Sequence, residues 1–128
     1  MSVTRIYTVI VLDDQSTSRT ILARGMARFG PNVRVVPFDD ASEAVDYARG
    51  RAIDLVLTDY RLQSCTGDEL IACMRALQTC VTTKFIVVTA SQSLCEWKRA
   101  RDAGAVEVVS KPVGHGFYRR CMDYLRDA

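Results

Sequence analysis

The stretch Asp54-Leu-Val-Leu-Thr-Asp59 places a carboxylate directly behind a short apolar run. Three further apolar runs lead in the same way to polar or charged side chains: Val9-Ile-Val-Leu12 before Asp13 and Asp14, Phe85-Ile-Val-Val88 before Thr89, and Val106-Glu-Val-Val109 before Lys111 and Pro112. Short runs rich in β-branched residues are typical of buried strands. Four such runs with reactive ends predict one site at one edge of a parallel sheet.

Amphipathic stretches lie between the apolar runs and predict helices. The first helix is expected to start at a Ser16 cap and to stop at Gly30-Pro31, with an apolar face of Ile21, Leu22, Met26 and Phe29. A second strand follows at 33–36. Asp40 and Glu43 resemble a capping box for a helix that ends at Gly50, and the third strand then opens at Ile53.

The second half of the chain repeats this alternation. Gly67 precedes a helix, a strand follows near Lys84, and the next helix closes at Gly104. The apolar faces of the last three helices are expected to contain Leu70, Ile71, Met74 and Leu77, then Leu94, Trp97 and Ala100, and finally Phe117, Cys121 and Leu125.

Five alternations of strand and helix without a linker predict an α/β fold. We expect one domain over residues 1–128: a doubly wound, flavodoxin-like sheet of five parallel strands in the order 2-1-3-4-5, with five flanking helices. In this order the first and third strands are neighbours at the switch point, where such sheets bind ligands beyond their carboxyl ends. Asp13, Asp14 and Asp59 are therefore expected to meet.

Composition excludes several other classes of protein. The 128 residues are 48% apolar and 25% charged, which suits an ordinary domain that buries its own core. The net charge is +2 and the arginines are scattered, so charge does not imply nucleic-acid binding. The five cysteines form no C-x-x-C motif and suggest buried thiols in a reducing compartment. No signal peptide or membrane span is predicted, and the expected location is cytoplasmic.

The acidic cluster has a chemical interpretation. Three adjacent carboxylates repel one another unless a cation lies between them, and Mg²⁺ commonly binds one or two carboxylates together with phosphate oxygens. Each aspartate alone could simply cap a helix or begin a turn. The presence of Thr89 and Lys111 at two further strand ends favours a functional site.

The ordered set of motifs resembles the receiver domain of two-component response regulators over essentially the whole chain. The matching stretches are Val9-Ile-Val-Leu-Asp-Asp14, Asp54-Leu-Val-Leu-Thr-Asp-Tyr-Arg-Leu-Gln-Ser-Cys-Thr-Gly67, Phe85-Ile-Val-Val-Thr-Ala90 and Asp102-Ala-Gly-Ala-Val-Glu-Val-Val-Ser-Lys-Pro112. The resemblance implies a phosphoacceptor aspartate at Asp59. It also implies a metal site that comprises Asp13, Asp14, Asp59 and the backbone carbonyl of Arg61.

The resemblance assigns further roles around the phosphoryl group. Thr89 would be the hydroxyl switch beside a small Ala90, and Lys111 would pair with the phosphate, aimed inward by a cis Lys111–Pro112 peptide bond. Arg61 and Ser91 would tune the lifetime of the phosphoryl group. Arg61 would do so either by shielding the acyl phosphate from water or by contacting the donor protein.

The implied function is Mg²⁺-dependent transfer of a phosphoryl group to Asp59 from a sensor histidine kinase or a phosphotransfer protein, with Mn²⁺ as a substitute metal. The phosphoryl group would then switch partner binding or an output domain. Such a chain is a phosphoacceptor and not an enzyme with a separate substrate. A homodimer through the fourth helix, fifth strand and last helix is expected, without direct contact to nucleic acid or membrane.

One departure from the family bears on switching. Val108 stands where receivers usually carry a tyrosine or phenylalanine that swings inward on activation. A valine has no ring to bury, so we expect output to depend on main-chain and helix movement in residues 90–104. The loop also has Gln63 where proline is frequent.

Three alternatives stay open at the level of sequence. A phosphorylation-independent pseudo-receiver is favoured by Val108 but not by the complete set of acids. A haloacid-dehalogenase-type phosphatase would need Asp-x-Asp after the first strand, where this chain has Asp13-Asp14-Gln15. A Rossmann nucleotide binder would need a glycine-rich turn at the same place.

Overall fold

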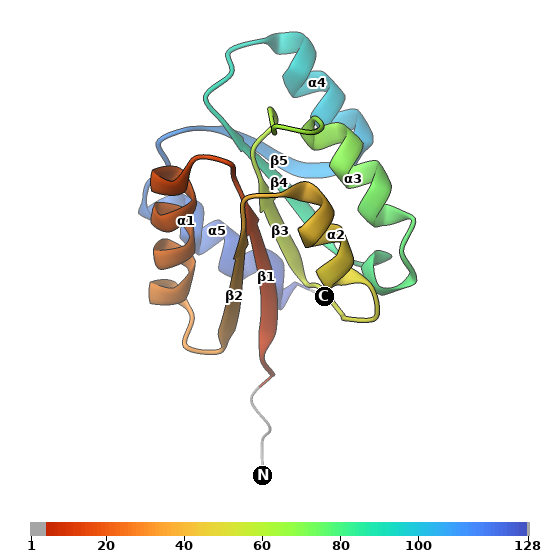
Figure 1. Cartoon of the computed structure of the whole chain (residues 1–128). Helices are drawn as coiled ribbons and strands as arrows, with labels where there is room; N and C mark the ends of the chain where they lie inside the picture. Colours follow the sequence, from red (N-terminus) through yellow and green to blue (C-terminus); the bar gives the residue numbers. More distant parts are fainter. Residues whose placement is uncertain (1–4, 128) are drawn as a thin grey trace.

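A five-stranded parallel sheet forms the centre of the computed structural model, which describes residues 5–127 (Figure 1). The strand order β2-β1-β3-β4-β5 and the five helices confirm the predicted fold class. The elements are β1 (Tyr7–Leu12), α1 (Ser16–Phe29), β2 (Val33–Phe38), α2 (Ala41–Ala48), β3 (Leu55–Thr58), α3 (Gly67–Arg75), the 3₁₀ helix η1 (Gln78–Cys80), β4 (Lys84–Thr89), α4 (Leu94–Ala103), β5 (Ala105–Ser110) and α5 (His115–Arg126).

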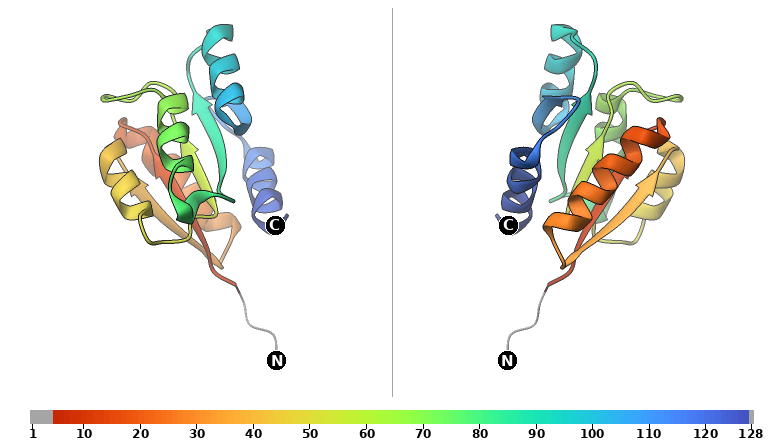
Figure 2. Two further views of the ribbon diagram at one scale, coloured as in Figure 1. Left: turned by 90° about the vertical axis from the view of Figure 1, so that its right-hand side faces the viewer. Right: turned by 90° about the vertical axis from the view of Figure 1, so that its left-hand side faces the viewer.

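Helices cover both faces of the sheet, as Figure 2 shows from two sides. Because successive strand residues point to opposite faces, β1 divides its side chains between two cores. Val9 and Val11 pack with α1 and α5, whereas Ile10 and Leu12 pack with α2 and α3. All four side chains have no exposed surface. The central strands are therefore held from both sides, as expected for a parallel sheet.

Strand register sets the positions of the site residues. Leu12 of β1 pairs with Thr58 of β3, so that Asp13 and Asp59 are the next residues of two adjacent strands. Thr89 of β4 pairs with Ser110 of β5, and Lys111 follows immediately. The carboxyl ends of four strands thus bring these side chains to one edge of the sheet.

Several predicted element boundaries are wrong by a few residues. Gln15, and not Ser16, occupies the N-cap position of α1 and makes no side-chain cap bond. β2 continues to Phe38 and β3 begins only at Leu55. α2 ends at Ala48, before Gly50. The 3₁₀ helix η1 was not predicted, because its three residues are too short for a periodic pattern.

Two apolar side chains expected in the core are exposed instead. Ile21 of α1 is 57% exposed and Leu94 of α4 is 84% exposed. Helical periodicity predicts which side of a helix is apolar, but it does not predict how much of that side the neighbouring sheet covers. In α4 only Ala100 is buried, with Trp97 partly buried beside it.

The helix termini follow local chemistry. The Asp40 side chain accepts a hydrogen bond from the Ser42 amide and so caps α2. Glu69 accepts from both the amide and the hydroxyl of Thr66 at the start of α3. Gly104, with a φ of 119°, ends α4 as predicted, in a conformation that favours glycine.

The cysteines only partly match the expectation of burial. Cys80 and Cys121 are buried, Cys65 is intermediate, and Cys73 and Cys95 are exposed on helices; all five are free thiols. Across residues 5–127, no helix has the length and apolar character required to cross a bilayer.

Candidate functional site

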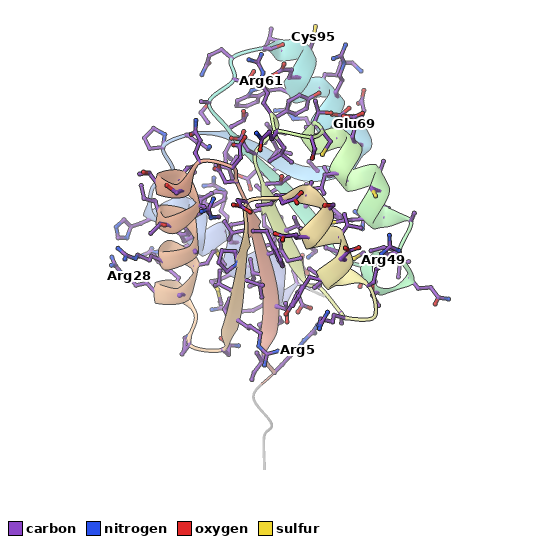
Figure 3. The ribbon with its side chains drawn as sticks, viewed as in Figure 1. Arg5, Arg28, Arg49, Arg61, Glu69 and Cys95 are labelled. Carbon is purple, nitrogen blue, oxygen red and sulfur yellow. The ribbon has the colours of Figure 1, made fainter. Side chains whose placement is uncertain are left out.

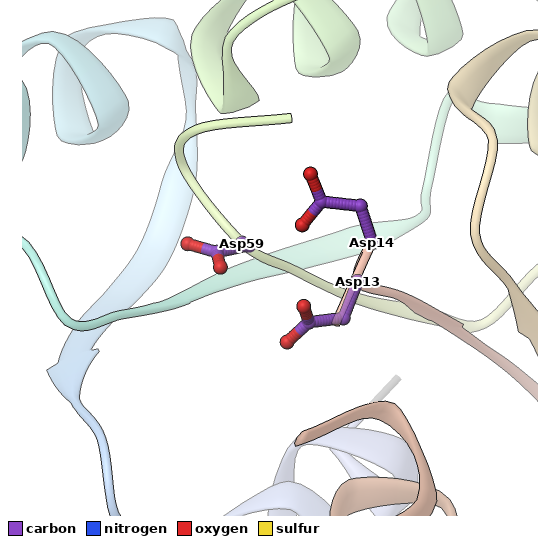
Figure 4. A group of neighbouring side chains, drawn as sticks. All are labelled: Asp13, Asp14 and Asp59. Carbon is purple, nitrogen blue, oxygen red and sulfur yellow. The ribbon is translucent and has the colours of Figure 1, made fainter. Parts of the chain in front are cut away.

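Three carboxylates converge at the carboxyl edge of the sheet (Figure 4). Asp13 and Asp14 follow β1 and Asp59 follows β3, and one oxygen from each lies within 4.8 Å of the others. Asp13 is fully buried, Asp59 is 9% exposed, and Asp14 is open to solvent. The predicted acidic cluster is therefore present, with one member facing solvent.

Lys111 provides the positive charge at this cluster. Its Nζ donates to Oδ2 of Asp13 and to Oδ2 of Asp59, both at 2.8 Å. Partial burial by itself would lower the pKa of the Lys111 ammonium, but the two carboxylates outweigh burial and the pKa lies above its ordinary value. The Lys111–Pro112 peptide bond is cis. The ammonium is thus fixed between two carboxylates that come from different strands.

A hollow of about 300 Å³ opens above Asp59. The predicted residues Thr89, Ala90 and Ser91 line it after β4. The Thr89 side chain is 2% exposed, and its Oγ1 accepts a hydrogen bond from the Ser91 amide at 3.1 Å. The remaining lining residues are Asp14, Gln15, Asp59, Arg61 and Lys111. Gln15 was not predicted as a site residue, although its position directly after Asp14 in the sequence indicates that it lies near the site.

The loop after β3 is folded tightly against Asp59. Asp59 Oδ1 accepts from the Tyr60 amide at 2.7 Å, and the Gly67 amide donates to the Tyr60 carbonyl at 2.6 Å. A Cβ at Gly67 would lie 3.1 Å from the Asp59 carbonyl oxygen and 3.2 Å from the Tyr60 Cα. Glycine therefore permits the close return of this loop, which carries Arg61 over the hollow.

The donor set suits a hard divalent cation. One oxygen from each of the three carboxylates lies within 4.8 Å of the others, near enough for all three to reach one cation. Asp14 offers an exposed carboxylate toward the hollow, which leaves room for waters or phosphate oxygens. Because carboxylates, a carbonyl and water are the ligands that Mg²⁺ prefers, these residues fit a metal site.

The site also contains a contact that sequence reasoning missed. The Arg61 guanidinium forms an ion pair with Glu96 in the first turn of α4, with 2.9 Å between Nη2 and Oε2. Ser93 and Glu96 are spaced like a capping box, and the Ser93 hydroxyl does accept from the Glu96 amide. The Glu96 carboxylate binds Arg61 and Ser91 instead of completing the box. The capping-box spacing was the only sequence signal for Glu96, and it predicts that the Glu96 carboxylate binds the Ser93 amide and not Arg61.

Val108 is buried, at 7% exposure, and lies in the core on the α2 and α3 side of the sheet. It pairs with Val87 in the register of β4 and β5. The position is therefore occupied by an inward aliphatic side chain and offers no ring that could change place.

A doubly wound parallel sheet with three acids, a hydroxyl and a lysine at the carboxyl ends of its strands is the arrangement of a class of signalling domains. The chain matches the family model described as the response regulator receiver domain over residues 9–117, and it belongs to that family. Receiver domains of this kind are signalling modules of two-component systems.

Relatives with known names agree with this assignment. The chain is 28% identical over 115 residues to the probable chemotaxis protein CheY of Rhizobium etli, with 88% of this chain and 86% of that protein covered. It is 27% identical over 119 residues to the cyclic di-GMP phosphodiesterase response regulator RpfG of Xanthomonas campestris, with 92% of this chain but 32% of that protein covered. It likewise spans 49% of the rice two-component response regulator ORR1.

Solved structures show the same fold. A response regulator of Burkholderia pseudomallei with a phosphorylated aspartic acid, a calcium ion and citrate superposes with a TM-score of 0.77 at 25% identity, over 93% of this chain and 66% of that one. The receiver domain of a sensor histidine kinase of Pseudomonas aeruginosa, with magnesium in its active-site cleft, gives a TM-score of 0.83 at 20% identity, over 96% and 99% of the two chains.

Proposed function

We propose that this chain accepts a phosphoryl group on Asp59 from a sensor histidine kinase or a phosphotransfer protein, in a reaction that requires Mg²⁺. The observation that carries the proposal is the Asp59 carboxylate at the floor of the hollow, 2.8 Å from the Lys111 ammonium and beside Asp13 and Asp14. An accessible carboxylate, a fixed cation and an acidic cluster are the groups that phosphoryl transfer to a carboxylate requires.

The transfer step uses groups already in place. A carboxylate oxygen of Asp59 attacks the phosphorus of a phosphohistidine, the phosphorus–nitrogen bond breaks, and the imidazole leaves with the bonding electron pair. Lys111 balances the carboxylate before transfer and the phosphoryl oxygens after it, because its ammonium is a compact charge on a flexible stem. The buried Thr89 hydroxyl lines the same hollow and can donate to a phosphoryl oxygen.

Asp13, Asp14, Asp59 and the Arg61 carbonyl are the groups that would hold Mg²⁺, with Mn²⁺ as a substitute. When bound, the ion would supply positive charge that balances the phosphoryl oxygens. Support comes from the phosphorylated aspartic acid and calcium of the Burkholderia protein and from the magnesium of the Pseudomonas receiver. Within the hollow, Arg61 and Ser91 would tune how long the acyl phosphate survives.

For output we propose movement of the segment 90–104, since Val108 offers no aromatic switch. The face made by α4, β5 and α5 would bind partners or a second copy of the chain. Exposed Leu94 and Val106 lie on these elements. We propose no direct contact with nucleic acid, because Arg120 pairs with Glu107 at 2.7 Å and Arg126 lies 3.9 Å from Asp123.

The test is phosphorylation with acetyl phosphate or a labelled histidine kinase in the presence and absence of Mg²⁺. Wild-type protein should form one hydroxylamine-labile acyl phosphate only with the metal, and Asp59→Asn should form none. Asp39→Asn is the matched control, because Asp39 is an exposed acid beside Asp14 in a neighbouring pocket but lies outside the three-acid cluster.

Each other outcome points to a different class of protein. Absence of labelling in the wild type would favour a pseudo-receiver that acts by binding alone. Continuous hydrolysis of a small phosphate ester, without a stable labelled protein, would favour a phosphatase of the haloacid-dehalogenase type.

A further inference from the structure

A hydrogen-bonded network joins the phosphoryl hollow to α4. Arg61, on the loop after β3, donates from Nε to both carboxylate oxygens of Glu96 at 3.2 Å and from Nη2 to Oε2 at 2.9 Å. Figure 3 labels Arg61 close to α4. Three donor contacts in a fork arrangement orient the guanidinium toward the helix.

Glu96 is itself held in place by the loop before α4. Its Oε1 accepts from the Ser91 hydroxyl at 2.5 Å, and its amide donates to Ser93 Oγ at 3.3 Å. The neighbouring Trp97 donates from Nε1 to the Ser91 carbonyl at 2.9 Å. The Glu96 side chain is only 17% exposed, whereas that of Arg61 is 69% exposed. Glu96 is therefore the more buried member of the pair and has further partners in its own loop, whereas the Arg61 side chain is largely exposed.

Arg61 also faces a second anionic position. It lines the hollow together with Asp59, Thr89 and Lys111, where the phosphoryl group is proposed to form. A phosphoryl group adds about −1.5 to −2 charges and three acceptor oxygens at neutral pH, more than the single charge of Glu96. Arginine binds phosphate in the same bidentate way as carboxylate. The two anions therefore compete for one guanidinium.

We propose that Glu96 is a positioning residue that keeps the Arg61 guanidinium paired with α4 until Asp59 is phosphorylated. Arg61 then exchanges Glu96 for the phosphoryl oxygens, and the first turn of α4 loses its contact with the loop after β3. This inference rests on the proposed function. It supplies a link from Asp59 to α4 that does not require an aromatic side chain at Val108. By thermodynamic linkage, weakening the pair with Glu96 must strengthen the binding of a phosphoryl group.

The test measures the affinity of the protein for beryllofluoride, a phosphoryl mimic, in saturating Mg²⁺. Trp97 is the only tryptophan of the chain and contacts Ser91, so its fluorescence reports the transition. Glu96→Gln keeps the shape of the side chain but removes the charge, and should tighten apparent binding about two- to fivefold, the range of an exposed ion pair. In an Arg61→Ala background the same change should have no effect, because no guanidinium remains to be released.

The matched control is Asp102→Asn, which breaks an ion pair of 2.7 Å with Lys98 on the same helix without touching Arg61. It should leave the affinity unchanged. A second measurement follows amide hydrogen exchange in residues 94–97, which should become faster when beryllofluoride binds to the wild type but not to Arg61→Ala.

The possible results separate this inference from the function on which it rests. Suppose that the wild type binds beryllofluoride and that Glu96→Gln binds it equally well or more weakly. The role of Glu96 is then refuted and the phosphoacceptor function stands. The same conclusion follows if Glu96→Gln tightens beryllofluoride binding in the Arg61→Ala background as well. If neither beryllofluoride nor acetyl phosphate acts on the wild type, the proposed function itself is wrong.

Discussion

Nζ of Lys111 lies 2.8 Å from Oδ2 of Asp59, although 52 residues separate the two in sequence. Asp59 follows β3 and Lys111 follows β5, with β4 between these strands. The Lys111 side chain therefore reaches across β4 to Asp59. The short distance between Nζ and Oδ2 depends on the correct pairing of β3, β4 and β5.

Loss of the Lys111 ammonium should impair both stability and phosphorylation. In Lys111→Gln the fully buried Asp13 carboxyl group loses its cationic partner, which should lower the free energy of unfolding by about 1–3 kcal/mol. The rate of labelling by acetyl phosphate should fall by about 10²-fold, because the developing phosphoryl charge loses a fixed cation. Urea denaturation and labelling kinetics measure the two effects. Unchanged labelling would contradict the role of Lys111.

Mg²⁺ should stabilise the native protein, because the proposed metal site exists only when the acidic cluster is folded. At free Mg²⁺ a hundredfold above its dissociation constant, the gain is about 2.7 kcal/mol. Asp14→Asn should lose most of this gain, whereas Asp39→Asn should retain it. Thermal unfolding with Mg²⁺ and with EDTA tests this; equal responses of the two variants would place the metal elsewhere.

Gly67 should not tolerate a side chain. An alanine Cβ would press against the main chain of Asp59 and Tyr60, and the loop would have to move at a cost of about 1–3 kcal/mol. Gly116→Ala in α5, where the nearest atom is 3.8 Å away in a flexible arginine, should be neutral or stabilising. The two variants are compared by chemical denaturation, and similar losses would show that the loop is not tightly constrained.

The buried thiol of Cys121 should remain protonated in alkaline solution. Burial raises its pKa to about 12, whereas a thiol in the unfolded chain ionises near pH 8.5 to 9. Because the native state then binds more protons than the unfolded state, stability should fall as the pH rises above about 9. This fall should be smaller in Cys121→Ala. With a thiol reagent, Cys73 and Cys95 should react first, and early reaction of Cys121 would contradict its burial.

Leu94 should matter for association and not for folding. Its side chain is 84% exposed, so Leu94→Glu should change the free energy of unfolding by less than about 0.5 kcal/mol. If a phosphorylated homodimer forms through α4, the variant should remain monomeric in analytical ultracentrifugation with beryllofluoride and Mg²⁺. A dimer of unchanged stability would place the interface on another face.

The ends of the strands were the most predictable part of the molecule. Asp13, Asp59, Thr89 and Lys111 each follow a short apolar run, and parallel pairing leaves one edge where such residues can meet. The two faces of β1 were equally clear in principle, because alternation along a doubly covered strand is obligatory.

Features that depend on long-range packing were not predictable. Ile21 and Leu94 obey helical spacing and are nevertheless exposed, because the width of the covered strip is set by neighbouring elements. Arg61 and Glu96 are 35 residues apart in the sequence. The chain contains 14 other acidic and 16 other basic residues, and their spacing does not indicate which acid pairs with Arg61. Such contacts emerge only when the loops are placed in space.

Lys84, at the first position of β4, binds the carbonyl oxygens of Tyr124 and Asp127. The last turn of α5 is thereby fixed at the end of β4 opposite to Thr89, about 17 Å away for a strand of this length. A protein immobilised on a sensor surface through Asp127 would consequently present the hollow beside Asp59 outward, accessible to a kinase in the flowing solution.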